Sequence, residues 1–235
     1  MPDFSKRSYL AELLDAPGIP ALDLNRNLYE IEQINKLLGG YEPTLKGIQY
    51  FLEKYPVRDE PLRILDVGCG GGDTLRKIAL WAQYQNLDVE LYGVDLLDTA
   101  IAYAKNQKSA LPIHYKVSDF REFKADQPFH LAISSLFCHH LDEETLVSVL
   151  KSQLKMTQWG VIVNDLQRHP IAYWSIKWLT ALFSKSYLVK NDAALSVLKA
   201  FKEDDWQEIL RNIGVDANQI QWIWAFRYLV IIENA

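Results

Sequence analysis

A glycine-rich turn between a buried strand and a helix limits the folds open to this chain. The segment from Ile64 to Asp73 reads ILDVGCGGGD, and Leu62–Val67 is mostly apolar, as expected for a buried strand that leads into this turn. Glycines in such a turn let the backbone approach a ligand and adopt conformations that side chains forbid. Tight turns also occur for purely structural reasons, but here an acid, Asp66, stands just before the first glycine. The turn therefore predicts a ligand-binding site at the end of the strand.

Strands and helices alternate after residue 61. Strands are expected at 62–67, 89–94, 113–117, 129–134 and 161–164, with helices at 74–85, 98–107, 142–156 and 204–212. Asp98 is expected to be the N-cap of its helix. This alternation predicts an α/β fold with a parallel sheet and helices on both faces. Two final strands, 220–226 and 228–232, have only a short connection, which predicts an antiparallel pair at one edge.

The flanking segments predict the domain organisation. Residues 1–60 are expected to form a helical N-terminal cap, with helices through to about residue 56, in front of a core of residues 61–235. The segment at about 166–200 does not fit the alternation. It is expected to be a substrate-side insertion containing one amphipathic helix, around 171–183.

Composition excludes several classes of protein. The net charge of −5 argues against a nucleic-acid partner. Two cysteines, and a start without an apolar run, favour a reducing cytoplasm and no signal peptide. The longest apolar stretch, 171–189, is interrupted by Lys177 and Lys185, so no integral membrane segment is expected. The same helix is suited to peripheral contact with a membrane surface. The oligomeric state stays unknown.

Asp95, at the end of the second strand, is the second candidate ligand-binding residue. A carboxylate there can accept hydrogen bonds from both ribose hydroxyls of a nucleoside. Nicotinamide-dependent reductases share this layout, but their G-x-G-x-x-G fingerprint needs a glycine where this chain has Asp73. An aspartate there would place negative charge beside phosphates. A cationic cofactor without phosphate suits Asp66, Asp73 and Asp95 better.

The run from Asp66 to Gly72 resembles motif I of the class I S-adenosylmethionine-dependent methyltransferases. This resemblance covers about residues 40–235 and implies a Rossmann-like seven-stranded sheet ending in an antiparallel hairpin. It implies S-adenosylmethionine as cofactor, with Asp95 on the ribose and Asp119 on the adenine. The expected cofactor-binding residues are Asp66, Gly68, Cys69, Gly70, Asp95, Leu96, Asp119, Phe120 and Ser134. Within the family, the chain most resembles bacterial enzymes acting on quinones, phenols and polyketides.

Three histidines are candidate catalytic bases. His139 and His140 follow the fourth strand, at the expected mouth of the site, and His169 opens the insertion. Packing, solvation or helix capping is the alternative for each. No metal site is expected, because neighbouring histidines rarely converge on one ion and no Cys/His spacing indicates zinc. Arg168 and Tyr173 are candidate substrate-binding residues, with a surface ion pair and core packing as the alternatives.

The sequence thus predicts methyl transfer to a small molecule, by O-methylation of a phenolic or hydroxylated aromatic acceptor. C-methylation of a quinone-type lipid precursor, protein methylation and a non-catalytic cofactor-binding partner stay open. The segment 134–141 reads SSLFCHHL. It lacks the Asn/Asp-Pro-Pro-aromatic motif that methyltransferases acting on nucleic-acid bases commonly carry after their fourth strand. This difference argues against methylation of a nucleic-acid base.

Overall fold

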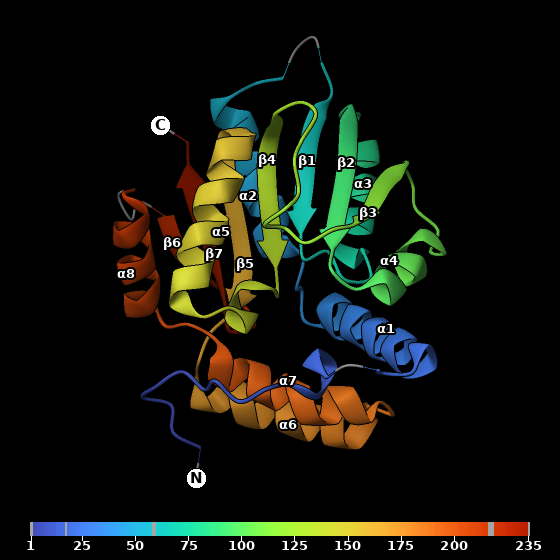
Figure 1. The fold of residues 1–235 in the computed structure, drawn as a ribbon, viewed down its shortest axis with the longest axis vertical. Helices are drawn as coiled ribbons and strands as arrows, with labels where there is room; N and C mark the ends of the chain where they lie inside the picture. Colours follow the sequence, from blue (N-terminus) through green and yellow to red (C-terminus); the bar gives the residue numbers. More distant parts are fainter. Residues whose placement is uncertain (1, 17, 58–59, 216–218, 235) are drawn as a thin grey trace.

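The computed structural model describes residues 2–16, 18–57, 60–215 and 219–234. Its sheet has seven strands in the order β3-β2-β1-β4-β5-β7-β6 (Figure 1). The strands are β1 (Leu62–Val67), β2 (Val89–Asp95), β3 (Ile113–Val117), β4 (Phe129–Ser135), β5 (Thr157–Leu166), β6 (Gln219–Ile223) and β7 (Arg227–Glu233). Strands β1 to β5 are parallel, whereas β7 runs antiparallel to both β5 and β6. The predicted α/β sheet with an antiparallel C-terminal pair is confirmed.

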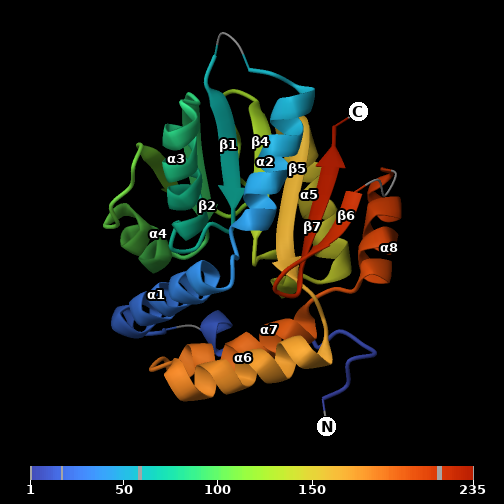
Figure 2. The same ribbon diagram turned by 180° about the vertical axis from the view of Figure 1, so that it is seen from behind.

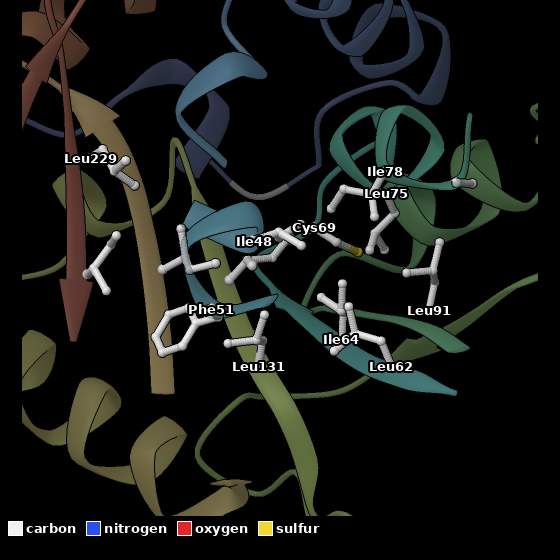
Figure 3. Close-up of a cluster of buried hydrophobic side chains, with 14 of the residues drawn as sticks. Ile48, Phe51, Leu62, Ile64, Cys69, Leu75, Ile78, Leu91, Leu131 and Leu229 are labelled. Atoms are coloured by element: carbon white, nitrogen blue, oxygen red, sulfur yellow. The ribbon is translucent and has the colours of Figure 1, made fainter. Parts of the chain in front are cut away.

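Helices cover both faces of the sheet, which explains why the central strands β1 and β4 are buried along most of their length. One face carries α2 (Glu42–Lys54), α3 (Asp73–Gln85) and α4 (Asp98–Lys105), and the other carries α5 (Glu143–Met156) and α8 (Glu203–Ile213) (Figures 1 and 2). Figure 3 shows the first of these layers, where Ile48 and Phe51 of α2 and Leu75 of α3 lie against strands β1 and β4. All three side chains are fully buried.

Three further helices lie beyond the carboxyl edge of the parallel strands: α1 (Ala21–Leu37), α6 (Pro170–Phe183) and α7 (Tyr187–Lys199) (Figures 1 and 2). The insertion therefore holds two helices rather than the one expected. The expected cap of residues 1–60 also differs from the structure, because α2 packs on β5 and β7 as part of the core. Every helix of the described residues is too short or too polar to pass through a bilayer.

The first residues form an extended segment rather than the expected helix. Within residues 2–16, only Leu13–Asp15 is helical, as one 3-10 turn, η1. Distant parts of the chain take up the backbone donors instead. Ser8 donates its N–H to the carbonyl of Leu198, and Leu13 and Leu14 each donate to the Asp192 carboxylate at 2.9 Å. These long-range bonds tie the segment across α7.

Capping residues set two helix boundaries near the carboxyl edge. Helix α5 begins after Asp142, whose carboxylate accepts the N–H of Thr145 at 2.8 Å. The prediction that Asp98 caps α4 is wrong, because Asp98 is the first helical residue and Leu97 occupies the cap position. The N–H of Leu97 is instead held by the carboxylate of Asp95, at 2.9 Å.

Candidate active site

The glycine turn joins β1 to α3 and fits glycine alone at two positions. Gly68 has a φ of +73°, and an added Cβ would lie 2.3 Å from the ring of Phe137. Gly72 has a φ of +72°, and its Cβ would lie 2.2 Å from the hydroxyl of Tyr115. Both positions combine a left-handed backbone with close packing, which no other side chain tolerates. The turn is therefore a tightly packed cradle in which Gly68 and Gly70 remain partly accessible.

Asp95 closes one side of this cradle. Its carboxylate accepts the N–H of Gly70 at 2.8 Å through Oδ2, and that of Leu97 through Oδ1. Burial raises the pKa of Asp95, although these backbone hydrogen bonds oppose the effect. Each oxygen keeps a lone pair, so the carboxylate can accept further hydrogen bonds from a ligand.

Asp66 lies at the base of the turn with an unsatisfied oxygen. Its side chain is buried, and its Oδ1 has no hydrogen-bond partner among the described residues. Burial, together with the charges of Asp73 and Asp95, raises the pKa of Asp66 well above its usual range. A buried polar atom without a partner requires an explanation, and a cationic or donor ligand group would supply one. The turn thus fits a ligand that carries an ammonium group.

A histidine–aspartate pair lies beside the turn, between the ends of β4 and β5. His139 belongs to a short 3-10 helix, η2 (Cys138–His140), and its Nδ1 lies 2.6 Å from Oδ1 of Asp165. The backbone N–H of His139 donates to the other carboxylate oxygen at 2.9 Å. Burial raises the pKa of Asp165, but the charge and hydrogen bonds of His139 outweigh it and lower the pKa.

This arrangement selects one tautomer of the His139 imidazole. A carboxylate on Nδ1 holds the proton there and leaves Nε2 as the basic nitrogen. No hydrogen bond engages Nε2 of His139 within the described parts of the chain. The pair therefore has the geometry of an oriented general base.

Comparisons with known proteins show which kind of domain the chain contains. Residues 64–160 match the family model described as a methyltransferase domain. The chain is 24% identical over 213 residues to the ubiquinone biosynthesis O-methyltransferase of Nitrosospira multiformis, and the match covers 84% of each chain. The matched segment is thus a methyltransferase domain, and most of the chain is similar to S-adenosylmethionine-dependent methyltransferases.

Solved structures show the same fold. The plantazolicin methyltransferase BpumL, in complex with a triazolic substrate analogue and SAH, superposes with a TM-score of 0.61 and 17% identity. That match covers 80% of this methyltransferase and 69% of BpumL. Magnesium protoporphyrin IX methyltransferase from Synechocystis gives a TM-score of 0.55 and 14% identity, over 83% and 84% of the two chains.

The residues expected around the adenine lie at the surface near the ends of β2 and β3. Leu96 is 65% exposed, and Phe120 contacts Phe137 edge-to-face with ring centroids 5.7 Å apart. Asp119 is held by Arg121, which donates from its backbone and its guanidinium. These hydrogen bonds lower the pKa of Asp119. An adenine amino group would therefore compete with Arg121 for this carboxylate.

Two other expected cofactor residues turn their side chains away from the turn. The thiol of Cys69 is buried near Gly93, so only the Cys69 backbone belongs to the cradle. Ser134 accepts a hydrogen bond from Nε2 of Gln153 at 2.9 Å and faces α5. Alternation along β4 points the Ser134 hydroxyl to the face that carries α5, so only the backbone of Ser134 is available to a cofactor.

His140 faces the N-terminal segment. It lies in the 3-10 turn η2 rather than at the end of strand β4, so strand alternation does not set its direction. Its Nδ1 lies 3.7 Å from Glu12, which also pairs with Lys199 at 3.2 Å. Burial, His139 and Lys199 lower the pKa of His140 well below its usual range. Glu12, His139 and His140 could together hold a metal ion, but Lys199 already neutralises Glu12.

His169 acts in the structure as a helix cap. Its Nδ1 accepts the N–H of Ile171 at 3.2 Å, and its ring stacks on Phe226 with centroids 5.1 Å apart. A ring held in this way has only Nε2 left for chemistry. The His139–Asp165 pair is the better oriented of the two candidate bases.

Arg168 is structural, so the prediction that it binds substrate is wrong. Its side chain is buried and donates to the carbonyls of Ala200 at 2.6 Å and Phe4 at 3.2 Å. It also pairs with Asp205 at 3.0 Å. Tyr173 is buried too and contacts Phe4 edge-to-face, which makes it part of the packing between α6 and the N-terminal segment.

Replacing Arg168 with leucine should therefore destabilise the protein without changing its affinity for the acceptor. The expected loss is about 3 kcal/mol of unfolding free energy, because Asp205 and two carbonyls lose a buried donor. Chemical denaturation would measure it. Arg211→Leu, on the exposed face of α8, is the control and should change stability by less than about 0.5 kcal/mol. A raised KM with unchanged stability would contradict this assignment.

Sequence reasoning missed a buried polar network beside the turn. Arg227 donates to Asn164 at 3.3 Å and to Asn35 at 2.8 Å, and Asn35 donates to Asp73 at 3.0 Å. Tyr41 also donates to Asp73, at 2.8 Å. Burial lowers the pKa of Arg227 to about 10. The network joins α1, β5 and β7 to the start of α3, and no local motif marks its members other than Asp73.

Proposed function

We propose that this methyltransferase transfers a methyl group to an oxygen of a small phenolic or hydroxylated aromatic acceptor. The observation that carries the proposal is the buried His139–Asp165 pair beside the glycine turn. Phe137 links the two features, because it follows β4 shortly before His139 and its ring packs on Gly68. The similarity to a ubiquinone biosynthesis O-methyltransferase supports the same class of acceptor.

The cofactor would lie along the turn. Asp95 would accept hydrogen bonds from the ribose hydroxyls, and the unsatisfied oxygen of Asp66 would face the ammonium group. The backbone of Gly68 to Gly70 would line the middle, with Leu96, Asp119 and Phe120 around the adenine. S-adenosylmethionine supplies a methyl group already activated by its sulfonium, so the protein contributes mainly positioning.

The protein must also make the acceptor nucleophilic. A neutral phenol is a weak nucleophile, and loss of its proton gives a far stronger one. In the proposed reaction, Nε2 of His139 takes the hydroxyl proton, and the carboxylate of Asp165 stabilises the resulting imidazolium. The N-terminal segment and α7 cover this pair and keep bulk water from it.

An acceptor panel tests the proposal. The protein would be incubated with S-adenosylmethionine and a set of phenols, catechols and hydroxylated quinols, and SAH and methylated product would be measured by mass spectrometry. Turnover with hydroxylated aromatics, and none with matched analogues lacking the hydroxyl, is the expected result. Binding of SAH with no turnover on any hydroxylated aromatic would reject the proposed acceptor class. A calorimetric titration with NADH should show no binding.

Asp66→Asn should raise the stability of the cofactor-free protein while weakening SAH binding about tenfold. The raised pKa of Asp66 means that folding takes up a proton between the unfolded and folded pKa values. Wild-type stability therefore falls as the pH rises through that interval, and the variant escapes this loss.

Thermal unfolding at about pH 5 and about pH 8 should show that Asp66→Asn exceeds the wild type in stability by more at the higher pH. An advantage that shrinks with rising pH would contradict the assignment. Asp98→Asn is the exposed control.

A further inference from the structure

Helix α6 exposes a continuous apolar stripe. Ile171, Trp174, Trp178 and Leu182 follow one another at helical spacing and are 59%, 44%, 66% and 71% exposed, and Phe183 is 76% exposed. The opposite side of α6 packs on α7. Ala172 and Tyr173 of α6 form a small core there with residues of α7. Exposed apolar side chains occur singly on most proteins, whereas a contiguous set marks an interaction surface.

Two more exposed tryptophans lie close to the start of this stripe. Trp222 and Trp224, in and next to the β6–β7 hairpin, are 51% and 64% exposed, and both contact the ring of Phe226. Phe226 in turn stacks on His169, the cap of α6. The hairpin tip and α6 are therefore adjacent, as Figure 2 also shows. We call the stripe of α6 with these two tryptophans the α6 face.

The charge around the α6 face is positive although the chain is acidic overall. From Leu166 to Asn191 the sequence contains no aspartate or glutamate, and Lys177, Lys185 and Lys190 are exposed. The nearby Glu30 of α1 is occupied by the backbone N–H groups of Lys185 and Ser186. An apolar helix surface with exposed lysines on the same and the following segment is complementary to an anionic lipid headgroup layer.

We propose that the α6 face binds the surface of an anionic lipid bilayer, with α6 lying parallel to that surface. Tryptophan side chains are enriched at membrane–water interfaces. In both views α6 is the outermost helix at the carboxyl edge, and only the start of the N-terminal segment reaches further out (Figures 1 and 2). A second copy of the chain fits less well, because the exposed lysines of two copies would face one another.

Vesicle binding tests this inference without any methyl transfer, so its failure is separate from failure of the proposed acceptor. The full chain would be sedimented with vesicles of phosphatidylcholine alone and of phosphatidylcholine with phosphatidylglycerol. Binding should be stronger to the anionic vesicles and should decrease with salt. Trp178→Glu should lower the partition coefficient at least about tenfold. Lys177→Gln should lower it about fivefold, on anionic vesicles only.

Tyr84→Glu is the matched control, because Tyr84 is 76% exposed near the end of α3, far from the α6 face. It should bind vesicles like the wild type. Loss of binding in both glutamate variants, or equal binding by Trp178→Glu and wild type, would overturn the proposal. So would a lipid-free dimer, detected by analytical ultracentrifugation, that Trp178→Glu dissociates.

Discussion

Replacing His139 with glutamine is expected to lower kcat for a phenolic acceptor about 10³-fold while leaving the affinity for SAH unchanged. General bases contribute about 10²- to 10⁴-fold, and glutamine keeps a polar side chain but cannot take the proton. Steady-state kinetics with saturating cofactor would measure kcat, and calorimetry would measure SAH binding. Asp165→Asn should lower kcat about 10²-fold, because the amide no longer fixes the proton on Nδ1 or stabilises the imidazolium.

The dependence of kcat on the acidity of the acceptor distinguishes a catalytic base at His139 from a residue that only supports the local structure. A nitrophenol that is already ionised at the assay pH does not need deprotonation, so His139→Gln should recover most of its activity on that acceptor. An equal loss of kcat on ionised and un-ionised phenols would show that His139 only supports the local structure. His169→Gln is the comparison variant and should leave the ratio between the two acceptors unchanged.

Replacing Asp95 with alanine is expected to weaken SAH binding at least about 100-fold. The variant loses the proposed acceptor of two ribose hydrogen bonds, each of which contributes about 1.5–3 kcal/mol when one partner is charged. It also releases the N–H of Gly70, so the turn loses a contact that holds it in place. Isothermal titration calorimetry measures this change directly.

Asp98→Ala is the control for Asp95→Ala. Asp98 is exposed at the start of α4, three residues further along the chain, and removal of its charge should change SAH affinity less than twofold or so. Equal affinities for wild type and Asp95→Ala would place the cofactor elsewhere. Thermal unfolding of the variant without cofactor would show whether the turn itself has been lost.

The core of the fold was predictable because its signals are local. Strands β1 and β3 have the bounds that the sequence predicts. Strand β1 is a short, mostly apolar run between turn residues, whereas β3 is a half-exposed edge strand in which apolar and polar residues alternate. Strand β5 begins at Thr157, before the predicted start at residue 161. The prediction started late because Gln158 and Gly160 interrupt the apolar run. Helix α7 was not predicted because α6 covers one side of it and the N-terminal segment and core cover others, so it lacks a single apolar stripe.

The site was less predictable because its contacts join distant residues. The motif gave Asp66 and Asp95 directly, but the pairing of His139 with Asp165 depends on β4 and β5 being neighbours, with Ser135 opposite Asn164. That strand order could have been inferred from the family resemblance, and it would have brought the two residues together. Nothing local indicates that Glu12 reaches the same region.

Charge alone also misled the interpretation of Arg168. The sequence shows a basic residue at the start of an insertion, where an anionic substrate could bind. Its carbonyl partners, on Phe4 and Ala200, come from parts of the chain that local patterns do not connect. Burial of a charged side chain follows from tertiary packing, and a single sequence does not reveal it.

In the proposed reaction, the enzyme methylates an oxygen of the acceptor after His139 removes its proton. The most direct test is to supply S-adenosylmethionine with an isotopically labelled methyl group and a phenolic acceptor that turns over, and to identify the labelled position by NMR. The account predicts an O-methyl product, formed by the wild type and almost absent with His139→Gln. A label on carbon, or equal O-methylation by both proteins, would contradict it.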